Sequence, residues 1–172
     1  MNILGLIKSR RSIRKFKSWP VEEEKLNQVL EAVRLAPSAC NFQPYKFIVV
    51  RDEAIRKALL PACRNRSFIT EAPLIIVGCT YPDKAYKRMG GNGNSHEVDL
   101  AIAFDHLTLM AWELGLGTCW IGAFEEDEVK KVLHIPDSVR VVALTPLGYP
   151  DEKPGLHDRK SLKELVVYDR WE

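Results

Sequence analysis

The stretch from Val98 to Leu114 constrains the fold of this chain more than any other, because it is apolar around most of its circumference. In a helical projection, Asp99, His106 and Glu113 recur every seven residues and form one narrow polar stripe. Apolar side chains occupy two further faces, and Asp105 interrupts only the second of them. Such a helix is buried on most sides. We expect one face to pack on the chain's own sheet, while the second needs another cover.

Two packing partners are possible for that second face: another copy of the chain, or other parts of the same chain. Burial of each large apolar side chain contributes roughly 1.5–3 kcal/mol before conformational entropy is counted. The free energy gained by burying these apolar side chains therefore outweighs the cost of burying one carboxylate, at Asp105. We favour a homodimer, and a central helix buried wholly within one chain is the alternative.

Helices and strands mix along the chain without strict alternation, which predicts an α+β fold. Strands are predicted for the apolar, β-branched runs at 47–50, 74–77 and 139–147, with shorter ones at 118–121 and 166–167. Helices are predicted at 2–9, at 53–60, at 125–133, and from Pro20 to Pro37. The segment 82–95 contains three glycines and is interpreted as a mobile loop. The length favours one domain over residues 1–172.

The charge balance argues against a general nucleic-acid or membrane binder, since 25 basic residues face 23 acidic ones. No targeting segment or membrane span is evident, and the cysteines are too widely spaced for a zinc or redox pair. We therefore expect a cytoplasmic protein. His96, Asp99 and His106 match no strong ligand spacing, so we expect no metal site.

The first candidate for chemistry is the basic segment that begins at Arg10. In an extended backbone Arg10, Ser12 and Arg14 point to the same side and form a strip of donors. Guanidinium groups bind phosphate in a bidentate manner, so the strip suits a phosphorylated ligand. The pair Arg159-Lys160 could complete such a site. A solvated basic face and a solvated tail are the alternatives.

Two further segments suit a ligand with a flat ring. The stiff loop from Ser38 to Pro44 offers amide and hydroxyl groups, which both donate and accept hydrogen bonds. The run from Gly115 to Phe124 contains glycines that let a ligand approach the backbone closely. The alternatives are an ordinary turn between a helix and a strand, and a helix end followed by a core strand.

Seven motifs follow one another along nearly the full length of the chain: Arg10-Arg11-Ser12-Ile13-Arg14, Pro37-Ser38 with Asn41 and Gln43-Pro44, Glu71-Ala72-Pro73, Val98-Asp99, Gly115 to Gly122, Leu147 to Pro150, and Arg159. Together, in this order, they resemble the nitroreductase family of flavoproteins. The resemblance implies a central, mostly antiparallel sheet flanked by helices. It also implies an intertwined homodimer with two FMN sites in the interface.

The resemblance also implies roles for individual residues. Arg10, Ser12 and Arg159 would hold the FMN phosphate, with Lys160 as a possible addition. Arg14 would lie near the pyrimidine end of the ring, where a positive charge stabilises reduced flavin, and Arg11 would contact the flavin too. The residues expected from the other subunit are Pro37, Ser38, Ala39 and Asn41. The backbone around Ile121 and Gly122 would face the ring, with one N–H directed at flavin N5.

The function implied is an FMN-dependent oxidoreductase that uses NADH or NADPH to reduce nitroaromatic, quinone or similar electron-poor small molecules in a ping-pong cycle. The chemistry would belong largely to the cofactor, and no side chain is an obvious obligate acid or base. A non-catalytic flavin-binding or flavin-storage protein is the alternative. Departures from the family pattern lie around the ring and pocket, at Ala39, Cys40, Tyr45 and Arg66.

Overall fold

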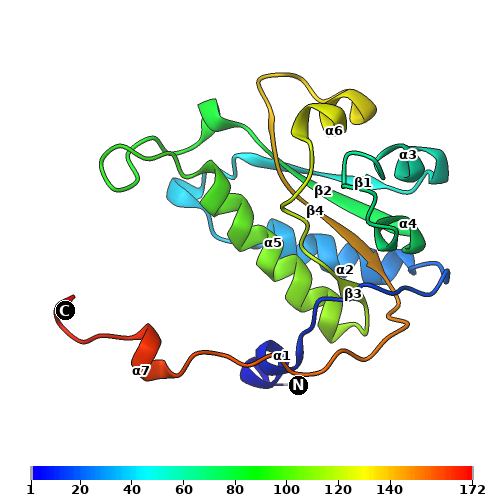
Figure 1. The fold of residues 1–172 in the computed structure, drawn as a ribbon. Coiled ribbons are helices and arrows are strands. Elements are labelled where there is room, and N and C mark those ends of the chain that lie inside the picture. Colours follow the sequence, from blue (N-terminus) through cyan, green and yellow to red (C-terminus); the bar gives the residue numbers. More distant parts are fainter. Residues whose placement is uncertain (1, 172) are drawn as a thin grey trace.

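The computed structural model describes residues 2–171 and centres on one antiparallel sheet (Figure 1). The four strands follow the order β1-β2-β4-β3 across the sheet. Their bounds are Tyr45–Val50 for β1, Leu74–Thr80 for β2, Gly117–Thr118 for β3 and Arg140–Gly148 for β4. Every pair of neighbouring strands is antiparallel, so the predicted mostly antiparallel sheet is confirmed.

Helices cover both faces of this sheet, as the α+β prediction requires. On one face lie α2 (Glu23–Arg34) and α5 (His96–Glu113), and α5 runs obliquely across the strands (Figure 1). On the other face lie α3 (Glu53–Ala58), α4 (Phe68–Glu71) and α6 (Glu126–Leu133). The short elements are α1 (Ile3–Ser9), η1 (Ala39–Asn41), η2 (Pro82–Lys84) and α7 (Leu162–Leu165).

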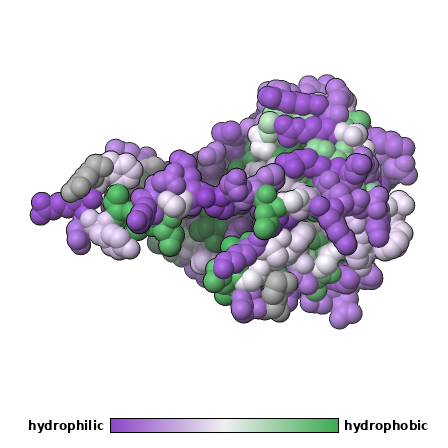
Figure 2. Space-filling view, turned by 60° about the horizontal axis from the view of Figure 1, so that its bottom comes forward, coloured by the Kyte–Doolittle hydropathy of each residue, from purple (hydrophilic) through white to green (hydrophobic). Residues whose placement is uncertain are grey.

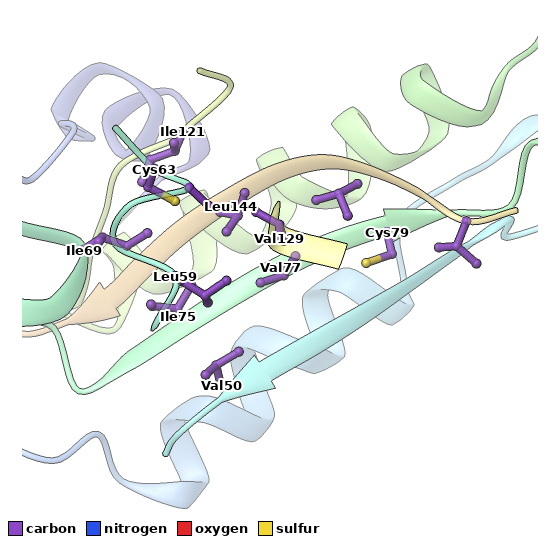
Figure 3. Packing of buried hydrophobic residues seen from close by; sticks show 13 residues of the cluster. Val50, Leu59, Cys63, Ile69, Ile75, Val77, Cys79, Ile121, Val129 and Leu144 are labelled. Atoms are coloured by element: carbon purple, nitrogen blue, oxygen red, sulfur yellow. The ribbon is translucent and has the colours of Figure 1, made fainter. Parts of the chain in front are cut away.

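Strand β2 is buried along its whole length because both of its faces meet helices. Leu74 and Ile76 point toward α2 and α5, while Ile75, Val77 and Cys79 point toward α3 and α6. Successive strand residues alternate between faces, so a continuous apolar run gives two cores at once. Figure 3 shows the second of these cores, with residues of β2 and β4 facing the helical layer.

Helix α5 has the two apolar faces expected from its sequence, and they differ in burial. Leu100, Phe104 and Leu107 are fully buried against the sheet and α2. On the second face, Val98 is 45% exposed and Ile102 is only partly buried. The chain therefore covers the first face itself and leaves the second one open.

The segment from Ser12 to Lys17 is extended and is held between two parts of the chain that lie far away in sequence. The N–H of Ile13 donates to Thr118 O at 2.8 Å, and the N–H of Lys17 donates to Tyr149 O at 2.9 Å. The Ile13 side chain is fully buried, which turns its two neighbours outward. The extended backbone expected for the basic segment is thus confirmed.

Three predicted elements differ from the structure. The helix expected from Pro20 begins at Glu23, because the Glu22 backbone is extended and the Tyr149 hydroxyl donates to the Glu22 carboxylate. The strand expected at 118–121 is shorter, since beyond Thr118 only Ile121 pairs, in an isolated bridge to Leu144. The expected strand at 166–167 is wrong: these residues follow α7 without a neighbouring strand among residues 2–171.

The last part of the chain, residues 156–171, leaves the body as an arm (Figure 1). Figure 2 shows this arm projecting from the body with apolar side chains along it. Tyr168 is 85% exposed and Trp171 is 91% exposed, and the other exposed apolar residues of the arm are Leu156, Leu162, Leu165, Val166 and Val167. Among residues 2–171, no helix combines the length and the apolar run needed to cross a bilayer.

Candidate cofactor site

A cavity of about 540 Å³ lies where the basic segment meets the beginning of the arm. Arg10, Ser12 and Arg14 line it from one side, and Arg159 lines it from the other. With Arg11, which also lines the cavity, the structure brings together five of the residues expected to bind phosphate or flavin, although Arg159 lies near the opposite end of the sequence. Lys160 is exposed and is not among the lining residues.

The strip of donors follows from the packing of one residue. Ile13 is buried between α4 and β3, so Ser12 and Arg14 point to the cavity side. The N–H of Arg14 donates to the Glu152 carboxylate, which fixes the backbone at this point without occupying the guanidinium. Arg10 lies just beyond α1, where its N–H caps the helix by donating to Leu6 O.

Arg11 has a different environment from the other two arginines. Its Nε donates to Gly155 O at 3.2 Å, and its Nη1 donates to Lys8 O at 2.8 Å and to Arg10 O at 2.7 Å. All of these acceptors are main-chain oxygens. The Arg11 guanidinium thus ties the end of α1 to the chain that leads to Arg159, and it holds the two walls of the cavity together.

Cys119 lies behind the strip, next to Ser12. Burial raises the pKa of its thiol, and the positive charges of Arg14 and Arg66 only partly oppose this effect. The thiol therefore stays protonated at neutral pH, which makes it a poor nucleophile.

The two main-chain N–H groups at Ile121 and Gly122 have different environments. The N–H of Ile121 donates to Leu144 O at 2.8 Å, so it is committed to the sheet. Gly122 is exposed, and its N–H has no hydrogen-bond partner in the described part of the chain. Of the two, Gly122 is the one whose N–H is free to face a ligand.

The loop from Pro37 to Pro44 lies at the opposite end of α5 from the cavity. The N–H of Ala39 donates to Asp99, near the start of α5, whereas Trp112, near its end, donates from Nε1 to Ser9 of α1. A helix rises about 1.5 Å per residue, which separates these two anchor points by about 20 Å. Within one chain the structure therefore does not bring Pro37, Ser38, Ala39 and Asn41 to the cavity.

Four lining residues were missed by the sequence interpretation: Ile7, Lys8, Leu156 and His157. His157 is two residues before Arg159, and side chains two apart in an extended segment share a side, so spacing could have found it. Lys8 lies in the last turn of α1, one turn before the strip, and no motif in the sequence marks it.

The chain matches the Nitroreductase family over residues 7–67 and 64–149. It is 35% identical over 162 residues to a Methanothermobacter thermautotrophicus protein provisionally named an NADH dehydrogenase or NAD(P)H nitroreductase, and the match covers 92% of this chain and 82% of that one. It is similar to the crystal structure of a nitroreductase family protein from Clostridium difficile 630, with a TM-score of 0.90, 33% identity, and coverage of 99% and 100%. An FMN-dependent nitroreductase of Clostridium difficile R20291 gives a TM-score of 0.84 at 31% identity, with coverage of 98% and 100%.

Proposed function

The chain belongs to the Nitroreductase family, and from that premise we propose that it binds FMN in the cavity beside Arg10 and uses NADH or NADPH to reduce small electron-poor acceptors. At the family level it is an NAD(P)H oxidoreductase. The acceptors we propose are nitroaromatic compounds, quinones and similar molecules. The single observation that carries the FMN assignment is the convergence of Arg10, Arg14 and Arg159 on one cavity.

The residues of this cavity fit a phosphate monoester. Arg10 and Arg159 approach from two sides, and the planar fork of each guanidinium matches a pair of phosphate oxygens. The Ser12 hydroxyl adds a donor that needs no charge. Lys8 lines the same cavity and adds a further positive charge. The opposite wall carries His157, and no acidic side chain lines the space, so an anion meets no repulsion there.

The part of the site nearest to the reacting atoms is main chain. A bound FMN would supply hydride-transfer chemistry, which no amino acid side chain supplies. The Gly122 N–H is free to donate a hydrogen bond, although Gly122 does not line the cavity itself, and the bond between Ile121 and Leu144 holds this backbone in place. The chain would thus contribute a fixed donor and a positive field rather than an acid or base.

A homodimer supplies the rest of the proposed site. In one chain the polar loop with Asn41 lies about 20 Å along α5 from the cavity, so the loop and the cavity can serve one ligand only if they come from two copies. The open face of α5 and the apolar arm are the surfaces that a second copy would cover. A two-fold dimer would contain two such composite sites.

The first prediction concerns Arg10. Purified protein should be yellow, with the visible absorption bands of flavin, and Arg10→Ala should lose FMN readily because a charge-assisted contact to phosphate is removed. We expect the dissociation constant for FMN to rise by roughly tenfold to a hundredfold, as for a hydrogen bond to a charged group. Equilibrium dialysis against FMN measures this constant.

Lys15→Ala is the matched control for this variant, because Lys15 is an exposed cation in the same segment that does not line the cavity. It should bind FMN like the natural chain. Equal retention of FMN by Arg10→Ala and Lys15→Ala would show that the phosphate lies elsewhere. Anaerobic addition of NADH or NADPH should bleach the yellow colour, and a nitroaromatic or quinone should restore it. A flavin that no donor reduces would point to storage instead.

A further inference from the structure

Asp99 is a buried carboxylate whose charge has no ion-pair partner in the described part of the chain. It is 2% exposed, and it lies in the first turn of α5, where the N-terminal helix dipole favours a negative charge. Removal of a carboxylate from water is costly unless hydrogen bonds compensate for the lost hydration. Such a group is kept only where its oxygens have specific partners, which makes those partners informative.

The two oxygens of Asp99 bind two different segments. Oδ1 accepts from the N–H of Ala39 at 2.8 Å, and Oδ2 accepts from the Ser95 hydroxyl at 2.7 Å. Ser95 is itself 2% exposed, and its Oγ also accepts from the N–H of Tyr86 at 3.2 Å. The carboxylate therefore joins the loop at Ala39 to the segment that ends at Ser95.

The loop that Asp99 holds has an unfavourable backbone. Directly after Ala39, Cys40 has φ of 50° and Asn41 has φ of 56°, and Gln43 has φ of 49°. The left-handed region costs most residues on the order of 1 kcal/mol, so such a run needs support from outside. The Ser38 hydroxyl, which accepts from the N–H of Gln43 at 2.9 Å, provides one support. The contact of Ala39 with Asp99 links the loop to α5.

We propose that Asp99 is a positioning residue for FMN: it fixes the left-handed loop 39–43 so that this loop can contact the flavin, and Ser95 fixes Asp99. This inference rests on the proposed function. It assigns Asp99 no contact with the cofactor. Its role is to lower the cost of ordering the loop when the ligand binds, because the backbone is already in place.

Three variants separate the parts of this arrangement. Asp99→Ala removes the acceptor from both Ala39 and Ser95. Asp99→Asn keeps a carbonyl oxygen that can face the Ala39 N–H, and Ser95→Ala keeps that contact while it frees the other oxygen. Glu97→Gln is the matched control, since Glu97 is an exposed carboxylate in the same turn of α5.

The first measurement is hydrogen exchange at the Ala39 amide by NMR, on protein freed of flavin. We expect Asp99→Ala to speed this exchange by about tenfold or more, which corresponds to one lost hydrogen bond to a charged group. Asp99→Asn and Glu97→Gln should stay close to the natural chain. The exchange rate of Ser95→Ala should lie between that of Asp99→Ala and that of the natural chain. This measurement needs no bound cofactor, so it tests the geometry alone.

The second measurement is the dissociation constant for FMN and for riboflavin, which lacks the phosphate. Asp99→Ala should weaken both ligands about equally, by about tenfold, whereas Arg10→Ala should weaken FMN alone. Asp99→Asn should restore most of the affinity. If the natural chain fails to bind FMN, the proposed function fails. If the natural chain binds FMN, and Asp99→Ala binds FMN and riboflavin as tightly as the natural chain does, only the role of Asp99 fails.

Should Asp99→Ala not fold, as judged by circular dichroism, Ser95→Ala decides the matter. Faster exchange at Ala39 together with weaker binding of riboflavin, relative to Glu97→Gln, supports the positioning role. Exchange and binding equal to those of the natural chain overturn it.

Discussion

Gly117 and Ile13 illustrate at the scale of single residues how closely two distant segments of this chain approach. A Cβ atom added at Gly117 would lie 2.7 Å from Cγ1 and 2.9 Å from Cβ of Ile13. Ile13 is fully buried and its backbone is bound to Thr118, so it cannot move aside. Glycine is required here by the approach of a neighbour, since Gly117 has no positive φ.

We expect Gly117→Ala to destabilise the protein by about 1–3 kcal/mol, the usual range for an overpacked core. Urea denaturation measures the change. Gly155→Ala is the control, because an added Cβ there meets nothing within 4 Å. Equal stability of the two variants would mean that the strip carrying Arg14 is not held as described. The same strip forms the cavity wall, so Gly117→Ala should also weaken FMN binding.

Arg11 yields a second prediction at this scale. Arg11 lines the cavity, and its side chain donates to the carbonyls of Lys8, Arg10 and Gly155. Arg11→Lys should therefore loosen the wall that carries Arg159 although the charge is kept, because an ammonium cannot reproduce the guanidinium fork. Faster hydrogen exchange around Gly155 and weaker FMN binding are the expected results. Unchanged exchange there would leave Arg11 as a simple surface cation.

At the scale of elements, the sequence predicted best those strands whose burial follows from their own residue types. β2 has apolar residues at every position but Thr80 and Gly78, and it is buried on both faces. Its helical neighbours are amphipathic, as α2 is. The strand order β1-β2-β4-β3 carries no such local signal, because it depends on which segments meet after folding. The family resemblance, rather than periodicity, supplied the antiparallel sheet.

The elements predicted wrongly or too long depend on partners outside the pattern. Pro20 suits a helix start, but the Tyr149 hydroxyl holds Glu22 and delays the helix. Val166 and Val167 are apolar and favour burial. An apolar pair alone does not determine whether the residues that bury it belong to the same chain. The shared direction of Ser12 and Arg14 was predictable because a two-residue alternation is local. The role of Arg11 was not, because three carbonyls from separate places define it.

The buried thiols of the core allow a prediction of how the stability of the protein changes at high pH. Burial raises the pKa of Cys63 and of Cys79 to about 11, from the ordinary value of 9.0. Between these values the unfolded chain loses the thiol protons first, so the stability present below pH 9 declines as the pH rises toward 11. Urea midpoints measured from pH 8 to 11 should fall, and Cys79→Ala should flatten the slope. Cys40→Ala, at an exposed thiol, should keep the slope of the natural chain.

At the scale of the whole molecule, the separation of the cavity from the loop with Asn41 determines how the proposed site is built. One half of the proposed site lies near each end of α5. The arm and the second face of α5 are apolar surfaces that remain exposed or only partly buried. A closed two-fold dimer satisfies both conditions, since it pairs each half with its complement.

Mixed dimers test this arrangement directly. Arg10→Ala impairs the cavity in both sites of its own dimer, and Asp99→Ala impairs the loop in both sites of its own dimer. Refolding the two chains together should produce mixed dimers in which one site is intact in both halves, so FMN binding should return. Dialysis of the mixture against FMN, compared with each variant alone, measures the recovery. A mixture that binds no better than the average of its components would place both halves of a site in the same copy.

The clamp around Ile13 also bears on how such a protein is made in the cell. Ile13 and Lys17 pair with Thr118 and Tyr149, and Arg10 shares a cavity with Arg159, so these contacts join segments that are synthesised far apart in time. Contacts of such long sequence separation form late in folding. The cavity is therefore complete only after both of its walls have been synthesised and have folded against each other.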